Sequence, residues 1–557
     1  MLVPELYANL IREAVLRAQE AGDLPRFDIP EVSVQPPRRP EHGDLATSVC
    51  MQMAGLSHMA PVKVAQIVAG HVGASDMIGK VEVAAPGFLN MTLSAAWLAA
   101  QVECIEAAGE DWGRVNLGQG KRVQVEYGSA NPTGPLHVGF GRNVVLGDGI
   151  ANVLAAAGYD IHREYYVNDA GTQTGLLGKS LYARYAQALG QQVEFPEEGY
   201  HGQYIVDWAK EIADTQGEHY LSMPVPEAEA QLREIGVEKA LQSIRQDCSR
   251  LQIHYDNWYS EKSLYQGPTY ERAVSILRDG GYLYEKDGAT WFRATALDGG
   301  KDEVVVRSNG LTGYFASDIA YHYDKFVLRG FERVIDVWGA DHQGHVPRMH
   351  AMMRALGLDP AALTLILYQM VTIIQGGVNV VLSKRKGTLV SLKEILDDVG
   401  PDATRFFLLQ RSADSQMDFD VDLAKTQSDE NPVYYVQYAH ARIASVLRTA
   451  QERGWADWSD GDVMLLQHPK ELDLIRKMVQ LPEVVTRAAS ELAPHHLCYY
   501  AQELASAFHA FYQECRVVSS DPQDAETTKA RLKLVSAARR VLANTLRWIG
   551  VAAPERM

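Results

Sequence analysis

One segment constrains the possible folds of this chain more than any other: residues 121–143, KRVQVEYGSANPTGPLHVGFGRN. From Val123 to Tyr127 apolar and polar residues alternate, which is the period of a β-strand. Residues 128–135 are rich in glycine and proline and indicate a turn, and the residues after them suit a helix. Such a turn collects free backbone N–H groups and the positive end of the helix dipole, so it predicts a phosphate site. An ordinary strand-to-helix connection in a parallel sheet would show the same spacing.

The length and the periodicity of the chain predict three domains. A chain of 557 residues is expected to contain several, because a single core rarely grows beyond about 250–300 residues. Residues 116–400 alternate between strand and helix patterns, which favours an α/β domain with a Rossmann-type parallel sheet and a mostly helical insertion at about 180–300. Residues 1–115 predict an added α+β domain, and residues 401–557 an all-α helical bundle.

Charge and cysteine content limit the classes of function. A net charge of −17 argues against indiscriminate nucleic-acid binding, although it allows a local basic surface. No apolar run reaches the roughly 18 residues that a membrane span needs, and the amphipathic N-terminus is unlike a signal peptide, so we expect a cytoplasmic protein without membrane contact. Five scattered cysteines without a CxxC pair read as reduced thiols and suggest no metal site.

A second polar segment follows a predicted strand at residues 333–338. It reads Gly339-Ala340-Asp341-His342-Gln343-Gly344-His345. A glycine directly after a buried strand lets a ligand approach the backbone, and Asp341 could accept a hydrogen bond from a ribose hydroxyl. Asp341, His342 and His345 also have a spacing that a metal could use, but on a loop this is a weak metal signal.

Three successive cations mark residues 380–387, VVLSKRKG. Lys384, Arg385 and Lys386 follow Ser383 and end at a glycine, which suits a mobile loop that closes over phosphates. A basic hairpin turn would have the same composition.

Two tyrosines and an aspartate share one face of a predicted helix. Asp318 lies four residues after Tyr314 and three before Tyr321, so the three side chains project together. Two aromatic hydroxyls and a carboxylate would suit a guanidinium, which needs a planar acceptor and a stacking surface. An amphipathic helix that packs its tyrosines on the core, with Asp318 in solvent, would show the same pattern.

Together these segments resemble the arginyl-tRNA synthetases, a family of class I aminoacyl-tRNA synthetases. His137-Val138-Gly139-Phe140 is similar to the HIGH signature, except that Phe140 stands where the family has a second histidine. Residues 339–345 resemble the element that contacts adenosine, and residues 380–387 partly match the KMSKS loop. The resemblance runs from one end of the chain to the other, through GDLAT (43–47), PGFLN (86–90), NPVYYVQYAH (431–440) and the C-terminus.

The resemblance implies a two-step reaction. L-Arginine is activated with ATP, which releases pyrophosphate, and the arginyl group then passes from the adenylate to the terminal ribose of tRNA(Arg), which releases AMP. It further implies that Mg²⁺ is delivered with ATP, that activation needs bound tRNA, and that the N-terminal domain docks on the D-loop corner of the tRNA. We expect a monomer.

The resemblance also assigns roles to individual residues. His137, Ser383 and Lys384 are the expected catalytic residues, and Glu126 and Asp318 are expected to clamp the guanidinium. The expected ATP-binding residues are Pro132, Gly134, His137, Gly139, Gly339, Asp341, His342, Lys384 and Arg385. The expected arginine-binding residues are Glu126, Ser129, Asn131, Tyr314, Asp318, Tyr321 and Gln343. The expected tRNA-binding residues are Tyr434, Tyr438 and Arg540, the last in a run of cations near the C-terminus.

Three other functions share parts of this pattern. A class I synthetase for another amino acid would not need two acids for its side chain. A nucleotidyltransferase that acts on a small acid would share the phosphate motifs, but would not need a helical domain at its end. An RNA-binding paralogue with weakened catalysis would keep the outer domains and lose catalytic charges. Phe140 and Val381 favour this alternative, whereas His137, Asp341 and Lys384 argue against it.

Overall fold

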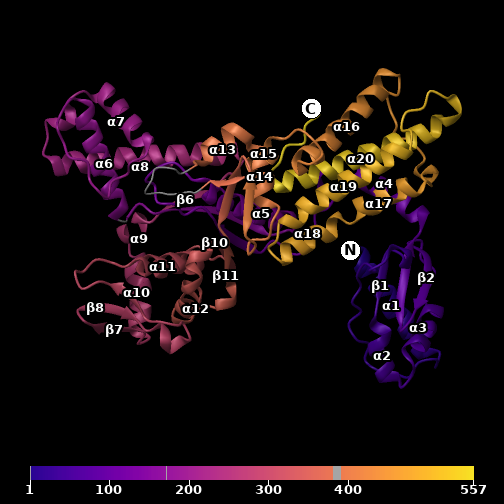
Figure 1. Ribbon diagram of the computed structural model, residues 1–557. Coiled ribbons are helices and arrows are strands. Elements are labelled where there is room, and N and C mark those ends of the chain that lie inside the picture. The colour runs from indigo at the N-terminus through magenta and orange to yellow at the C-terminus, as the bar shows by residue number, and fades with distance from the viewer. Residues whose placement is uncertain (1, 171, 381–389) are drawn as a thin grey trace.

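A five-stranded parallel sheet lies at the centre of the computed structural model, which describes residues 2–170, 172–380 and 390–557 (Figure 1). Its strand order is β11-β10-β4-β5-β6. The strands are β4 (Arg122–Glu126), β5 (Asp160–Val167), β6 (Asn257–Ser260), β10 (Arg333–Gly339) and β11 (Leu363–Tyr368). Helix α5 (Val138–Ala156) joins β4 to β5 and is buried along almost its whole length. The predicted α/β class with a Rossmann-type parallel sheet is confirmed.

The region predicted as one helical insertion consists of two parts. The first is helical, with α6 (Thr172–Ala188), α7 (Gln203–Gln216) and α8 (Val225–Arg250). The chain then returns to the central sheet as β6, which pairs with β5. The second part holds α9 (Lys262–Gln266), α10 (Thr269–Asp279) and an antiparallel sheet of β7 (Leu283–Lys286), β8 (Ala289–Phe292) and β9 (Glu303–Val306). Figure 1 shows the two parts as separate lobes beside the sheet.

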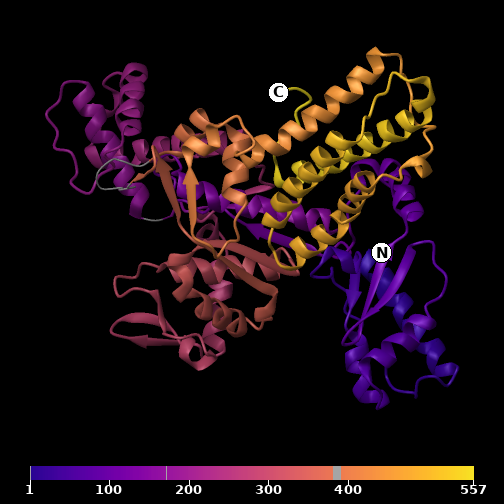
Figure 2. The ribbon, with the colours of Figure 1, turned by 45° about the vertical axis from the view of Figure 1, so that its right-hand side comes forward.

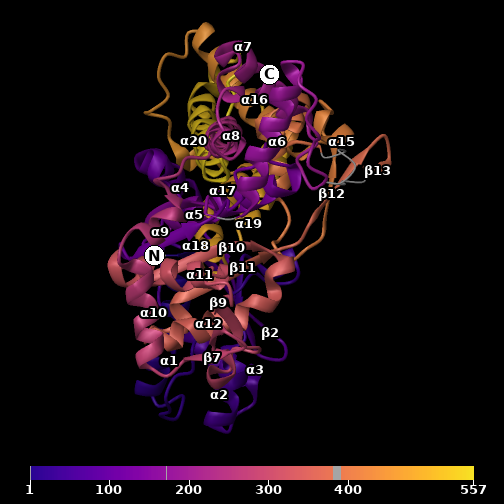
Figure 3. The same ribbon diagram turned by 90° about the vertical axis from the view of Figure 1, so that its left-hand side faces the viewer.

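The second half of the catalytic domain returns the chain to the sheet. It comprises α11 (Tyr314–Tyr323), a π-helical turn (Asp324–Leu328), β10, a 3₁₀ turn (Ala340–His345), α12 (Val346–Ala355) and β11. A small sheet of order β13-β12-β14 follows, formed by β12 (Val371–Gln375), β13 (Val378–Val380) and β14 (Met417–Asp420), and Figure 3 shows β12 and β13 projecting from the body. Helices α13 (Leu392–Val399), α14 (Pro401–Leu409) and α15 (Val421–Lys425) pack beside it.

The C-terminal part is a helical bundle, as predicted. It contains α16 (Pro432–Glu452), α17 (Pro469–Val479), α18 (Leu481–Ser490), α19 (His495–Glu514) and α20 (Ala525–Ile549). Helix α4 (Ala95–Ala108) packs on α17 and α20, although it precedes the catalytic domain in the sequence. Three ion pairs join α20 to α4 and to the 3₁₀ turn that follows it, η2 (Gly109–Asp111), namely Lys533–Glu103, Arg540–Glu106 and Arg547–Glu110.

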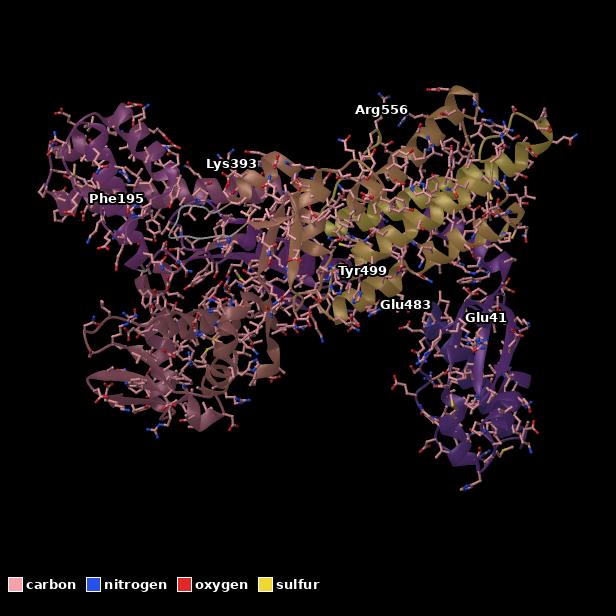
Figure 4. The ribbon with its side chains drawn as sticks, in the orientation of Figure 1. Glu41, Phe195, Lys393, Glu483, Tyr499 and Arg556 are labelled. Carbon is pink, nitrogen blue, oxygen red and sulfur yellow. The ribbon has the colours of Figure 1, made fainter. Side chains whose placement is uncertain are left out.

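The N-terminal unit forms a separate lobe below the bundle (Figures 1 and 2). Its antiparallel sheet has the order β1-β3-β2, built from β1 (Leu45–Thr47), β2 (Ile78–Ala84) and β3 (Phe88–Leu93), and it carries α1 (Val3–Glu20), α2 (Val49–Ser57) and α3 (Pro61–Gly70). Arg476 of α17 pairs with Asp44 across the junction at 2.8 Å, beside a cavity of about 290 Å³. Figure 4 labels Glu483, which lines this cavity on the edge of the bundle that faces the lobe.

These contacts place the domain boundaries differently from the sequence prediction. Because α4 packs on the bundle, we place the first boundary near Ser94 instead of residue 115. Because β14 pairs with β12, we place the last boundary near Asn431 instead of residue 401. No helix in the part of the chain that the structure describes is long and apolar enough to cross a membrane.

Candidate active site

Several predicted site residues meet at the carboxyl edge of the parallel sheet. Strands β4, β5, β6 and β10 end there, at Glu126, Val167, Ser260 and Gly339. In open parallel sheets ligands bind outside this edge. The turn after β4 and the 3₁₀ turn after β10 therefore face a common region.

The turn after β4 is held rigidly by its neighbours. Gly128 N–H donates to Asn143 Oδ1 at 2.6 Å, and Asn143 donates to the carbonyl of Val337 at 2.7 Å. Ala130 N–H donates to the Tyr165 hydroxyl at 3.3 Å, and Asn168 donates to the carbonyl of Ser129 at 3.2 Å. Farther along the turn, Pro132 is buried and the Asn131 side chain is exposed.

His137 is the N-cap of α5, directly before the first helical residue, Val138. Its Nδ1 accepts from the Phe140 N–H at 3.2 Å, so any proton the neutral ring carries sits on Nε2. The Gly139 N–H has no backbone acceptor among the described residues, and a side chain at Gly139 would crowd the His137 ring. Phe140 packs against the core, which accounts for an apolar residue where the family has its second histidine. The predicted phosphate site therefore has a helix N-terminus, a glycine and an imidazole together.

The adenosine element after β10 lies at the surface. Asp341 and His342 are largely exposed in the 3₁₀ turn, and their side chains are 3.7 Å apart. Gln343 is exposed as well. Among the described residues, no group of three acidic, histidine or cysteine side chains gathers at metal-binding distance.

Ser383, Lys384, Arg385 and Lys386 lie outside the described residues. The described chain begins again at Val390, beside His137, because Val138 N–H donates to the carbonyl of Val390 at 3.3 Å and Leu392 N–H donates to that of Leu136 at 2.7 Å.

The predicted clamp of Glu126 and Asp318 needs a correction. Glu126 accepts from the Lys325 ammonium, which also donates to Asp336 at 2.8 Å and lies 4.1 Å from the centre of the Tyr321 ring. Lys325 is fully buried. Its charge is shared between two carboxylates on adjacent strands, so Glu126 is already paired inside the protein. Burial outweighs this lysine for Glu126 and raises the pKa of that carboxyl to about 7.

The two tyrosines expected beside Asp318 do not converge on it. Tyr321 is buried and donates its hydroxyl to Glu164 at 2.5 Å, and its ring packs against Tyr166 and Tyr259. Tyr314 is 68% exposed at the start of α11. Tyr321 is therefore part of a buried aromatic cluster, and Tyr314 faces solvent at the start of α11.

Glu261, which the sequence analysis missed, is the acid beside Asp318. It follows β6, is 7% exposed, and accepts from Ser317 Oγ at 2.5 Å. Burial raises the pKa of Glu261, and burial together with the Glu261 and Asp336 charges raises the pKa of Asp318 to about 7. No described lysine, arginine or histidine lies within 4.0 Å of either carboxylate. Two neighbouring acids with raised pKa values, and with no described cation within 4.0 Å, can bind a cationic ligand.

On the helical bundle, aromatic and cationic side chains form a second surface. Tyr434 and Tyr438 stack in parallel on α16 with ring centres 6.1 Å apart, and Tyr438 also stacks on His509. Arg442 lies over the rings of Tyr438 and Tyr512. It lines a cavity of about 590 Å³ with Arg453 and Arg516.

The predicted basic face of α20 is neutralised by acids. Lys529, Arg531 and Arg539 pair with Asp460, Glu471 and Glu555, in addition to the three pairs with α4 and η2. Arg540, predicted to bind tRNA, is thus engaged with Glu106.

Comparison with known proteins identifies the family. The chain matches the family model for the catalytic domain of class I tRNA synthetases (R) over residues 102–429, the arginyl-tRNA synthetase N-terminal domain over 5–93 and the DALR anticodon-binding domain over 436–557. It is 49% identical to an arginine–tRNA ligase of Dehalococcoides mccartyi, over all of this chain and 99% of that one, and 47% identical to one of Geobacter sp., over 98% and 99%. The fold matches Thermus thermophilus arginyl-tRNA synthetase with a TM-score of 0.75 at 22% identity, over the whole of both chains. The chain belongs to the arginyl-tRNA synthetases, within class I of the aminoacyl-tRNA synthetases.

Proposed function

We propose that this chain is an ATP-dependent arginine–tRNA ligase. The observation that carries the proposal is the pair of carboxylates, Asp318 and Glu261, at the same sheet edge as the N-terminus of α5. We also propose that it acts as a monomer in the cytoplasm, where its five unpaired cysteines would stay reduced.

The guanidinium of arginine binds between Asp318 and Glu261. Arginine cannot be deprotonated in a protein, so a site that buries it must supply negative charge. Tyr166, whose hydroxyl interacts with Glu261, and Tyr321 wall the site, and Tyr314 closes its solvent edge. An apolar amino acid would leave both carboxylates unpaired, so the site discriminates strongly in favour of arginine over apolar amino acids.

The main chain of arginine faces the nucleotide. Ser129 and Asn131, on the turn after β4, and Gln343, on the turn after β10, orient the α-ammonium and carboxylate of arginine. Glu126 contributes only its second carboxylate oxygen, because the first accepts from Lys325. This arrangement turns the carboxylate of arginine toward residues 128–135, the turn after β4, which we call the phosphate turn.

Catalysis of the first step rests on positioning and charge. A carboxylate oxygen of arginine attacks the α-phosphorus of ATP, the bond from that phosphorus to the bridging oxygen breaks, and pyrophosphate leaves. Pro132, Gly134, Gly139 and His137 hold the phosphates, while Gly339, Asp341 and His342 hold the adenosine. Ser383, Lys384 and Arg385, close in sequence to the segment that reaches His137, supply further phosphate contacts. Mg²⁺ comes with ATP, since it is commonly held by substrate phosphates and water rather than by a protein cage.

In the second step a hydroxyl of the terminal ribose of tRNA(Arg) attacks the acyl carbon, and AMP leaves. The stacked Tyr434 and Tyr438 offer π-faces to unpaired bases, and Arg442 adds a cation beside them. Arg540 contributes to tRNA binding only when its ion pair with Glu106 breaks.

Arginine-dependent exchange of pyrophosphate into ATP tests the proposal. We expect exchange with arginine and tRNA(Arg), and none when lysine, ornithine or leucine replaces arginine. Assays with and without tRNA(Arg) show whether activation needs it. Absence of exchange with arginine and tRNA(Arg) both present would reject the ligase and favour a non-catalytic paralogue.

The affinity for arginine is expected to depend on pH through Asp318. Because the pKa of this carboxyl is raised to about 7, it is largely protonated below pH 7 and must lose that proton to pair with a guanidinium. The Kd for arginine should therefore increase by up to about tenfold per pH unit below pH 7 and level off above it. Calorimetric titration from pH 5.5 to 8.5 measures this, and a flat profile would contradict it.

Replacing Arg442 with alanine is expected to weaken tRNA(Arg) binding. It should also reduce the slope of log Kd against log salt concentration by about 1, the value for one lost phosphate contact. Arg448, on the same helix but bound to the carbonyl of Glu555, is the matched control and should leave that slope unchanged. Filter binding at several salt concentrations measures both, and equal effects of the two changes would argue against a specific role of Arg442.

A further inference from the structure

The phosphate turn is held by a residue from a part of the molecule with no other role in the site. Asn143, Tyr165 and Asn168 fix residues 128–130 from the catalytic sheet and α5. The other end of the turn is fixed by Tyr204, near the start of α7, whose hydroxyl donates to the carbonyl of Thr133 at 2.8 Å. Helix α7 belongs to the helical lobe marked by Phe195 in Figure 4, which lies on the far side of the sheet from the bundle.

The Tyr204 ring also packs tightly on the turn. A Cβ at Gly134 would lie 2.6 Å from this ring, so the close approach depends on a glycine. Trp208 also packs against this ring, edge to face, with ring centres 4.9 Å apart. Burial raises the pKa of Tyr204, so its hydroxyl keeps its proton and remains a donor at neutral pH.

A second tyrosine contacts the same threonine. Tyr200 interacts with the side chain of Thr133. The lobe therefore contacts Thr133 twice, once on the carbonyl and once on the side chain. Thr133 N–H is turned inward to the carbonyl of Asn131 at 2.8 Å, so fixing Thr133 fixes the shape of the turn.

We propose that Tyr204 is a positioning residue for ATP, which holds the Thr133–Gly134 peptide in the shape that receives the triphosphate. It does not touch the reacting atoms; it links the position of the helical lobe to the geometry of the phosphate turn. The inference rests on the proposed function only in taking ATP as the ligand of this turn.

Tyr204→Phe tests the inference, because it removes the hydrogen bond and keeps the ring. We expect KM for ATP to rise about five- to tenfold while KM for arginine stays within about twofold. Tyr200→Phe combined with Tyr204→Phe should raise KM for ATP further. Tyr185→Phe is the matched control: its hydroxyl donates to the carbonyl of Gly217 at 2.5 Å in the same lobe and makes no contact with the turn. It should leave KM for ATP unchanged.

Direct ATP binding separates this inference from the proposed ligase activity. Calorimetry with ATP alone should show the same five- to tenfold weakening in Tyr204→Phe, with a thermal midpoint close to that of the parent protein. An unchanged affinity in the double variant, or an equal loss in Tyr185→Phe, would overturn the inference. If the parent protein binds ATP but shows no arginine-dependent exchange, the ligase proposal fails, and the ATP affinities still decide the role of Tyr204.

Discussion

Asp318→Asn is expected to lower kcat/KM for arginine by at least about 30-fold while ATP affinity stays within about twofold. The change removes one of two carboxylates that face the guanidinium and keeps the shape of the side chain. Losing one partner of a buried charge pair costs about 2–5 kcal/mol, which corresponds to about 30-fold to about 4,000-fold in affinity. Pyrophosphate exchange at varied arginine and varied ATP measures the two effects separately.

The stability of the same variant shows whether Asp318 acts on the ligand or on the fold. An acid whose pKa is raised on folding, as that of Asp318 is to about 7, contributes stability below its ordinary pKa and loses it as pH rises through 7. Without arginine, Asp318→Asn should therefore be at least as stable as the parent protein at pH 8.

Asp302→Asn provides a control from a neighbouring lobe. Asp302 accepts from the Thr295 N–H and the Tyr284 hydroxyl, both at 2.9 Å. Its loss should affect stability and leave KM for arginine unchanged. Equal loss of arginine and ATP binding in Asp318→Asn would show instead that this acid supports the fold.

The parts that the sequence predicted are those with local signals. The phosphate turn was predicted because a strand, its turn and its helix are contiguous, and His137 lies at the start of that helix. The parallel sheet was predicted from the alternation of strand and helix patterns. Residues 381–389, which hold the KMSKS-like cations, lie outside the described part, so their roles stay predictions.

The parts that the sequence did not predict depend on partners far along the chain. Strand β6 has four residues and pairs with β5 more than 90 residues earlier, so Glu261 was placed in a helical insertion instead of at the sheet edge. The cations of α20 looked free because their acids on α4 and η2 lie more than 400 residues away. The sequence did contain a signal that Lys325 lies near the site. Lys325 stands seven residues after Asp318, which is two helical turns along the same face.

Lys325→Met is expected to destabilise the centre of the catalytic sheet by about 3–5 kcal/mol at pH 7. Asp336 and Glu126 are in register on the adjacent strands β10 and β4, so their side chains rise from the same face of the sheet. Parallel strands lie about 4.8 Å apart, and like charges at that distance repel unless a cation lies between them. The π-helical turn after α11 brings Lys325 to that position. Methionine fills a similar volume but leaves Glu126 without a counter-ion and Asp336 with His322, 3.0 Å away, as its remaining partner.

The pH dependence of this loss follows from Asp336. Burial alone would raise its pKa, but Lys325 and His322 outweigh burial and lower it to about 2. A lowered pKa contributes stability above the ordinary value near 4, and this contribution is lost as pH falls toward 2. The difference between the parent protein and Lys325→Met should therefore be largest at neutral pH and should shrink below about pH 4.

Hydrogen exchange of peptides that cover β4 and β10 measures this loss in the full chain, where several domains need not unfold together. Lys533→Met is the control, because Lys533 is also largely buried but its acid, Glu103, is half exposed; its loss should cost about 1 kcal/mol or less. Adding Asp336→Asn to Lys325→Met should restore part of the protection, since it removes the negative charge that lies beside Glu126 on the adjacent strand. If hydrogen exchange of β4 and β10 were unchanged in Lys325→Met, Lys325 would not be needed for Glu126 and Asp336 to lie side by side. The two acids would then share a proton instead.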